Sequence, residues 1–162
     1  TYLRRFTSWK WTTAADFQAA VAALQKGDPK VLINRIAEIL AAGCGTRSYL
    51  TVEEKDFHWA LLVGANFAPG YDVFVEHEVR GSEKGFIDLL MVSKTDTPSY
   101  LFEVKYLKKT AATPAAVKAK LEAAVKQADG YAEGLNIRTL PHLKKVAVVF
   151  GGFEAKAVKV WD

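Results

Sequence analysis

The run 100–107, which reads YLFEVKYL, limits the fold more than any other part of this chain. In an extended chain, successive side chains point to opposite faces. Both faces of this run are apolar, except that Glu103 and Lys105 fall together on one of them. A strand that is apolar on both faces is typical of the centre of a covered sheet. We therefore expect an α/β domain with two charged side chains buried in the middle of its sheet.

The neighbouring run FIDLLMV (86–92) carries a second isolated charge, Asp88. The stretch 94–98 between the two runs is short and turn-like, which predicts an antiparallel hairpin with Asp88 opposite or diagonal to Glu103. Two carboxylates so close repel each other and raise each other's pKa. A divalent cation between them removes the conflict, and hard oxygen ligands suit Mg²⁺, with Mn²⁺ as its substitute. Lys105 would orient or help deprotonate a water molecule, or stabilise charge that develops at phosphorus.

An internal ion pair is the structural alternative to a metal site. Lys105 could neutralise Asp88 or Glu103 directly, and the spacing Glu-x-Lys by itself is common. The residues alone leave both interpretations open.

The rest of the pattern predicts a mixed central sheet flanked by helices, with a helical segment in front. Asp28 and Pro29 are typical of a helix start, and Gly27 and Gly43 of helix ends. We expect residues 1–50 to form a helical lead-in packed on a core of residues 51–162. The expected helices are 12–26, 29–42, 51–67 and 113–133, the last with an apolar stripe of Val117, Leu121, Ala124, Ala128, Tyr131 and Leu135. The expected strands are 71–79, 86–92, 100–107, 145–152 and 157–161.

Composition excludes several classes of protein. A chain of 162 residues that is 50% hydrophobic fits one globular domain. Cys44 is the only cysteine, which rules out an intrachain disulfide, and the three histidines are too scattered for a Cys/His zinc cluster. Apolar runs are too short to span a membrane. The opening residues include neither an apolar signal segment nor Met, so we expect a piece of a longer protein or an artificially trimmed chain. The use of a single cysteine favours a reducing, intracellular location.

The net charge of +4 mildly favours a polyanionic partner, although many ordinary domains are equally basic. The lysines that could follow a phosphate backbone could equally form a solvated face. They are Lys105, Lys108, Lys109, Lys118, Lys120 and Lys126.

Five short segments together resemble the PD-(D/E)XK nuclease superfamily. They are EKDF (54–57), VEHEVR (75–80), GFID (85–88), FEVK (102–105), and Gln127 followed by YAE (131–133). The earlier segment ALQKGD (23–28) also resembles the lead-in helices of that superfamily's members, so the likeness runs from about residue 20 to about residue 155. It is greatest to the nuclease-like domain that ends bacterial proteins whose front half is an AAA-ATPase-like module. Two positions depart from the pattern, because Phe86 stands where that family usually has Arg and His58 where it often has Gln.

The resemblance implies a restriction-endonuclease-like core and Mg²⁺-dependent hydrolysis of DNA, which leaves 5′-phosphate and 3′-hydroxyl ends. By that resemblance Asp88, Glu103 and Glu54 are metal ligands, Lys105 is the catalytic lysine, and Gln127 lines the site. It also implies that the protein is bacterial and cytoplasmic. The partners that it implies are an upstream ATPase module in the same protein and a second copy of the chain in a homodimer.

Several of these residues have a plain structural alternative. Thr51 and Glu54 have the spacing of a capping box, in which each side chain bonds a free main-chain N–H. His58 would ordinarily pack between elements or lie at the surface, Gln127 could be solvated, and Tyr131 belongs to the apolar stripe of its helix.

Two other function classes remain. One is a catalytically inactive nuclease fold that binds nucleic acid or a protein, or regulates an attached ATPase. The other is a small-molecule enzyme that uses the Asp–Glu–Lys cluster, although no phosphate-cradling loop or nucleophile elbow supports it.

Overall fold

The computed structural model describes residues 14–43, 52–66, 68–81 and 84–162. Cys44, Thr51 and Phe67, which enter the expectations above, lie outside the described residues. The elements in chain order are α2 (Ala14–Gln25), α3 (Lys30–Gly43), α4 (Glu54–Asn66), β1 (Tyr71–Val79), β2 (Gly85–Ser93), β3 (Ser99–Leu107), the 3₁₀ turn η2 (Lys109–Ala111), α5 (Pro114–Ala132), β4 (Leu143–Gly151) and β5 (Glu154–Trp161).

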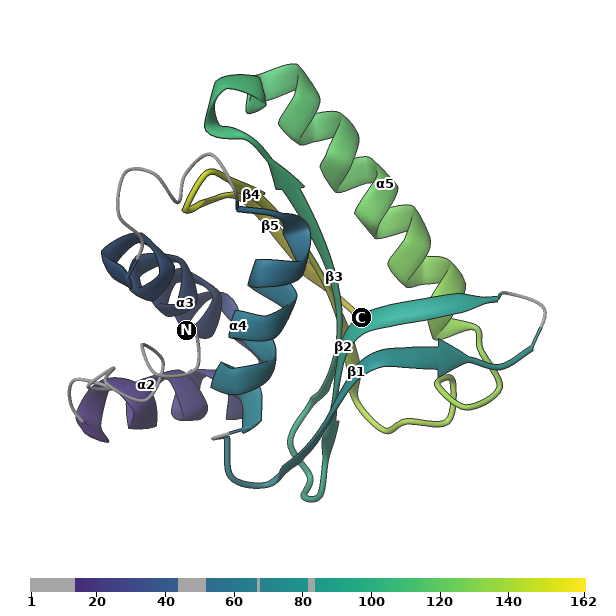
Figure 1. Cartoon of the computed structure of the whole chain (residues 1–162). Coiled ribbons are helices and arrows are strands. Elements are labelled where there is room, and N and C mark those ends of the chain that lie inside the picture. Colours follow the sequence, from purple (N-terminus) through teal and green to yellow (C-terminus); the bar gives the residue numbers. More distant parts are fainter. Residues whose placement is uncertain (1–13, 44–51, 67, 82–83) are drawn as a thin grey trace.

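One mixed sheet of strand order β1-β2-β3-β4-β5 forms the middle layer. β3 and β4 are parallel and are joined through α5, whereas every other neighbouring pair is antiparallel. Helices α2, α3 and α4 cover one face of the sheet and α5 covers the other (Figure 1). The expected α/β architecture is therefore confirmed, with β3 at its centre. Among the described helices, none has both the length and the apolar content that a membrane span requires.

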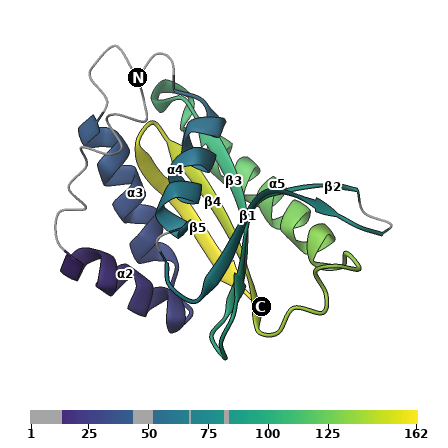
Figure 2. The ribbon, with the colours of Figure 1, turned by 60° about the horizontal axis from the view of Figure 1, so that its bottom comes forward.

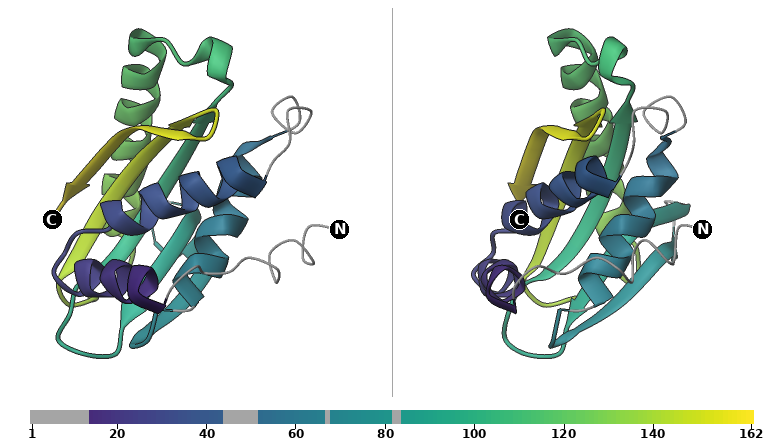
Figure 3. Two further views of the ribbon diagram at one scale, coloured as in Figure 1. Left: turned by 90° about the vertical axis from the view of Figure 1, so that its left-hand side faces the viewer. Right: turned by 60° about the vertical axis from the view of Figure 1, so that its left-hand side comes forward.

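Aromatic side chains fix the three-helix layer on the sheet. Phe57 of α4 stacks on Phe150 of β4 with 4.2 Å between ring centroids, and on Tyr106 of β3 at 5.3 Å. The Tyr100 hydroxyl of β3 donates to the carbonyl oxygen of Leu24 in α2. Figure 3 shows α3 lying across the strands β4 and β5. Helices α2 and α3 thus share one apolar core with the sheet.

The predicted capping residues carry out the expected roles at two helix starts. Asp28 Oδ1 accepts a hydrogen bond of 3.0 Å from Lys30 N, and Thr113 Oγ1 accepts one of 3.3 Å from Ala116 N. Gly27 follows α2 with φ of 89°, a conformation that favours glycine. These short-range signals are reliable because they depend only on neighbouring residues.

The expected extents of four elements need correction. Helix α4 begins at Glu54, three residues later than expected, and Asp56 Oδ2 accepts a bond of 2.8 Å from Glu53 N at its start. Leu135 does not extend the stripe of α5, because the helix ends at Ala132 and Leu135 is 56% exposed in the following loop. Strands β4 and β5 start earlier, at Leu143 and Glu154, because pairing with β3 and across the β4–β5 turn lengthens them.

Candidate functional site

Strand β2 separates from β3 at Asp88. The β2–β3 register runs from Met91 opposite Tyr100 to Leu89 opposite Phe102 and does not continue. The expected antiparallel hairpin is confirmed, but the pair that would join Asp88 to Glu103 is missing. Figures 1 and 2 show the far part of the β1–β2 hairpin turning away from β3 beside the end of α5.

A rotation of β2 at Asp88 accompanies this separation. Ile87 and Leu90 both pack in the apolar cluster on the α5 side of the sheet, although residues three apart in a regular strand face opposite sides. The β1–β2 register also omits the pair of Glu76 and Asp88, and Glu76 has a left-handed φ of 49°. Asp88 is therefore directed into the gap that opens between β2 and β3.

Two carboxylates occupy the edge of β3 that β2 has left. Asp88 Oδ2 accepts a hydrogen bond of 2.7 Å from Val104 N, and Glu54 Oε2 accepts one of 3.1 Å from Tyr106 N. Alternate N–H groups of a strand point to the same side, so both donors would otherwise face the missing strand. Glu54 thus contacts the edge of β3, whereas the capping-box alternative involves Thr51, which lies outside the described residues.

Glu103 lies on β3 and is 1% exposed. Its Oε2 lies 3.5 Å from Lys105 Nζ, whereas its Oε1 is buried and has no hydrogen-bond partner among the described residues. Burial, and next the nearby Asp88 carboxylate, raise the pKa of Glu103 to about 8, against the opposing effect of Lys105. Burial likewise raises the pKa of Asp88. The site thus holds two carboxylates whose ionisation the protein itself disfavours.

His58 joins this group from α4, one turn after Glu54. Its Nε2 lies 3.5 Å from Asp88 Oδ2, and both side chains are 16% exposed. The same Nε2 is buried without a hydrogen bond among the described residues. This contact between α4 and β2 agrees with the expectation that His58 packs between elements, and its spacing of four from Glu54 puts both residues on one side of the helix.

Tyr131 of α5 lies at the site and is not simply part of the core. A Cβ atom added to Gly85 would be 2.5 Å from the Tyr131 hydroxyl oxygen, so the phenol covers that glycine. Burial raises the pKa of Tyr131, and the charge of Glu103 adds to the rise. Gln127 stands one turn earlier on α5 and is exposed.

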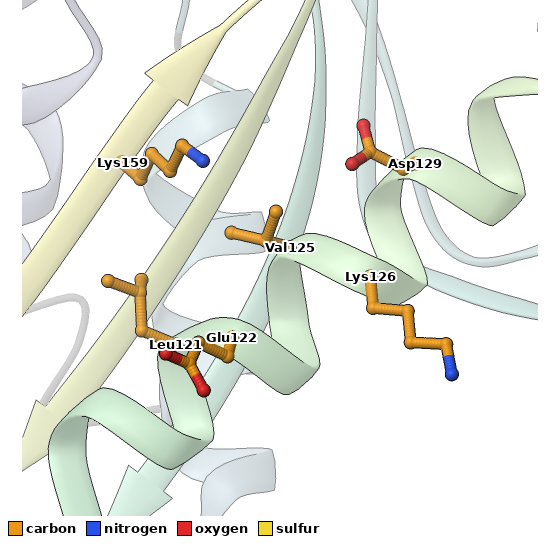
Figure 4. Close-up of a pocket in the computed structure, with 6 residues that line it drawn as sticks. All are labelled: Leu121, Glu122, Val125, Lys126, Asp129 and Lys159. Atoms are coloured by element: carbon orange, nitrogen blue, oxygen red, sulfur yellow. The ribbon is translucent and has the colours of Figure 1, made fainter. Parts of the chain in front are cut away.

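A separate groove lies on the other side of α5, against β5 (Figure 4). It is lined by Leu121, Glu122, Val125, Lys126, Asp129 and Lys159. Near it, Asp129 Oδ1 accepts bonds of 2.9 Å from both Lys145 Nζ and Trp161 Nε1, which ties the last strand to the helix. None of the predicted metal ligands and catalytic residues lines this groove, whereas Lys126, one of the candidate phosphate-binding lysines, does.

The donor set at the broken edge of β3 fits a hard cation. In the described part of the chain, no three His, Cys, Asp or Glu side chains form a ready metal cage. Mg²⁺ rarely uses such a cage, because it keeps several water ligands and binds through one or two carboxylates and substrate oxygens. Glu103 Oε1, beside Asp88 and without a hydrogen-bond partner within the described ranges, is the kind of atom that such an ion would satisfy.

Comparison with known proteins assigns the family. No curated protein matches the chain in sequence. The family model described as the PD-(D/E)XK nuclease superfamily matches residues 52–160, which run from α4 through all but the last residue of β5. A match over that much of the chain, on a mixed sheet covered by helices, shows that this protein belongs to the PD-(D/E)XK nuclease superfamily.

Proposed function

We propose that the protein is a Mg²⁺-dependent nuclease that hydrolyses DNA phosphodiester bonds. The observation that supports this most is the buried Oε1 of Glu103, which has no hydrogen-bond partner in the described part of the chain and lies next to a second carboxylate, Asp88, in a chain of a nuclease superfamily. An internal ion pair with Lys105 accounts for only one of the two Glu103 oxygens. A bound cation would account for the other and for the closeness of two acidic groups.

The metal shell in this proposal consists of Asp88 and Glu103, with Glu54 as its third acidic residue. When bound, Mg²⁺ would act as a Lewis acid on a phosphate oxygen and lower the pKa of a coordinated water. Lys105, whose side chain is 14% exposed, orients the attacking water and stabilises negative charge on the phosphoryl oxygens. The water oxygen bonds to phosphorus as the bond to the 3′ oxygen breaks, which leaves a 5′-phosphate and a 3′-hydroxyl.

Residues around this shell have supporting roles in the proposal. His58 holds Asp88 in place through its contact with Oδ2. Gln127 and Tyr131 form the wall on the α5 side, where the phenol, kept neutral by its raised pKa, can donate a hydrogen bond. The exposed lysines that follow β3 and continue along α5 offer positive charge to a phosphate backbone. They are Lys108, Lys109, Lys118, Lys120 and Lys126.

A cleavage assay with a matched acidic control tests the proposal. The protein is incubated with supercoiled plasmid and with single-stranded DNA, in Mg²⁺, in Mn²⁺ and in EDTA. We expect metal-dependent cleavage that Glu103→Ala reduces by roughly a hundredfold or more. Glu122→Ala, which removes an exposed carboxylate of α5, should cleave as the wild type does. Equal cleavage by Glu103→Ala and wild type would overturn the proposal.

A non-catalytic nuclease fold is the second candidate, and the exposed Phe86 in place of the Arg expected from the resemblance is the observation in its favour. Isothermal titration with Mg²⁺ separates the two. A lack of binding heat and of thermal stabilisation, together with nucleic-acid binding that persists in EDTA, would favour the non-catalytic module.

The wider setting remains a prediction. It comprises an upstream ATPase-like module, a homodimer and the bacterial cytoplasm.

A further inference from the structure

Two aromatic rings are the most exposed large apolar side chains among the described residues. Trp59 is 63% exposed and Phe86 is 60% exposed. Each adjoins the site in sequence, because Trp59 follows His58 and Phe86 precedes Asp88 by two residues. Since His58 contacts Asp88, the two rings stand on the two elements, α4 and β2, that meet at that carboxylate.

The packing of α4 explains why Trp59 is left in solvent. The helix turns Phe57 and Leu61 into the core, and both are fully buried. Trp59 stands two residues from each, about 200° away around the helix axis. Its indole therefore contributes little to the apolar core, and a helix built only for stability would carry a polar residue here.

Phe86 is exposed because β2 separates from β3, and the same separation forms the site. It lies on the part of β2 beyond Asp88, where β2 no longer pairs with β3. Its partner across the hairpin is Glu78, which is also exposed, whereas its neighbour Ile87 is buried on the α5 side. The face of the hairpin that carries Phe86 is thus uncovered, and Lys84 is exposed two residues away.

We propose that Trp59 and Phe86 stack on unpaired bases on either side of the bond to be cleaved, so that the preferred substrate is single-stranded or locally opened nucleic acid. This inference rests on the proposed nuclease function. Base stacking requires an accessible base face, which a duplex hides inside its own stack. Exposed aromatic rings on α4 and β2, the two elements that meet at Asp88, with the exposed Lys84 near Phe86, match a strand whose bases are free.

Binding of matched oligonucleotides tests this inference without cleavage. In a Glu103→Gln background, fluorescence anisotropy measures the affinity for a labelled single strand and for the blunt duplex of the same sequence. Phe86→Ala and Trp59→Ala should each weaken single-strand binding by roughly 5- to 100-fold, the value of one stacked base, and change duplex binding little. Phe86→Trp should keep the single-strand affinity that Phe86→Ala loses, because it retains an aromatic ring at this position.

Leu135→Ala is the control, since Leu135 is 56% exposed beside the hairpin at Gly81 but cannot stack. An equal loss with Leu135→Ala would show that any exposed apolar side chain on this surface contributes to single-strand binding, without stacking by a ring, and would overturn the inference. Equal losses on single strand and duplex, or no loss with either aromatic variant, would overturn it as well. If these results accompany metal-dependent cleavage by the wild type, only the inference fails. If the wild type neither cleaves nor binds any nucleic acid, the proposed function fails with it.

Discussion

The Asp88 carboxylate takes the place of a strand partner for Val104, whose main-chain N–H it accepts at 2.7 Å. The pairing of β2 with β3 ends at Leu89, the residue next to Asp88. A buried N–H that loses its ladder bond needs another acceptor, and the Asp88 side chain supplies it. The carboxylate that we propose as a metal ligand therefore also satisfies a main-chain N–H at the edge of β3.

Substitution of Asp88 should separate these two roles. Asp88→Asn keeps an oxygen that can accept from Val104 N, so its stability in EDTA should stay near that of the wild type. Asp88→Ala leaves that N–H without its partner and should be less stable than Asp88→Asn by about 1–3 kcal/mol. Both variants should lose stabilisation by Mg²⁺. Urea denaturation with and without Mg²⁺ checks this, and retention of the metal effect in Asp88→Asn would contradict a ligand role.

The metal-free protein should lose stability as pH rises, because of Glu103. The pKa of this carboxyl is about 8 in the folded protein against an ordinary value of 4.5. The folded state thus binds the proton more tightly, so the associated stability is fully present below 4.5 and is lost as pH rises through about 8. Melting temperatures in EDTA across this window should fall for the wild type and fall less for Glu103→Gln. Parallel pH profiles for the two proteins would disprove the assignment.

Lys105 should be needed for cleavage but not for metal binding. Its ammonium lies 3.5 Å from Glu103 Oε2 and competes with a cation for that carboxylate. Lys105→Met should therefore bind Mg²⁺ at least as well as the wild type while cleaving DNA roughly a hundredfold more slowly. Titration calorimetry and a plasmid assay on the same preparation measure the two properties. Weaker metal binding in Lys105→Met would show that the lysine acts by ordering the carboxylates.

Gly85→Ala should disturb the site from the hairpin side. The new Cβ would lie 2.5 Å from the Tyr131 hydroxyl oxygen and 2.7 Å from Cε1 of that ring, so ring or hairpin must move. Such overpacking typically costs about 1–3 kcal/mol. Gly85→Ala combined with Tyr131→Ala should recover much of that loss, because the clash is removed. A double-mutant cycle of unfolding free energies tests this, and purely additive effects would argue against the contact.

Much of the fold follows from local patterns in the sequence. β3 is predicted as a central strand because its apolar side chains occupy both faces, and it is central. Thr113 with Pro114, and Asp28 before α3, predict helix starts because a cap depends on residues within one turn. The prediction that Leu135 belongs to the apolar stripe of α5 was wrong. The helical spacing of apolar residues continues in the sequence beyond Ala132, where the helix itself ends.

The composition of the candidate site also follows from the sequence, and its connections do not. Asp88, Glu103 and Lys105 are recognisable as isolated charges in apolar strands, since burying them unpaired is costly. His58 gave only a weak signal, and its contact with Asp88 needs α4 to lie across the sheet. Tyr131 was assigned to the core because its helix stripe is apolar, and the stripe cannot reveal that the ring reaches Gly85.

By itself, the sequence determined which residues are strand, helix and buried charge, because alternation, periodicity and capping act over a few residues. Only the tertiary structure decided that β2 leaves β3 at Asp88 and that Asp88 and Glu54 bond the exposed N–H groups of Val104 and Tyr106. Those bonds join residues 16 and 52 positions apart. They depend on how strands and helices pack against one another, which no local pattern encodes.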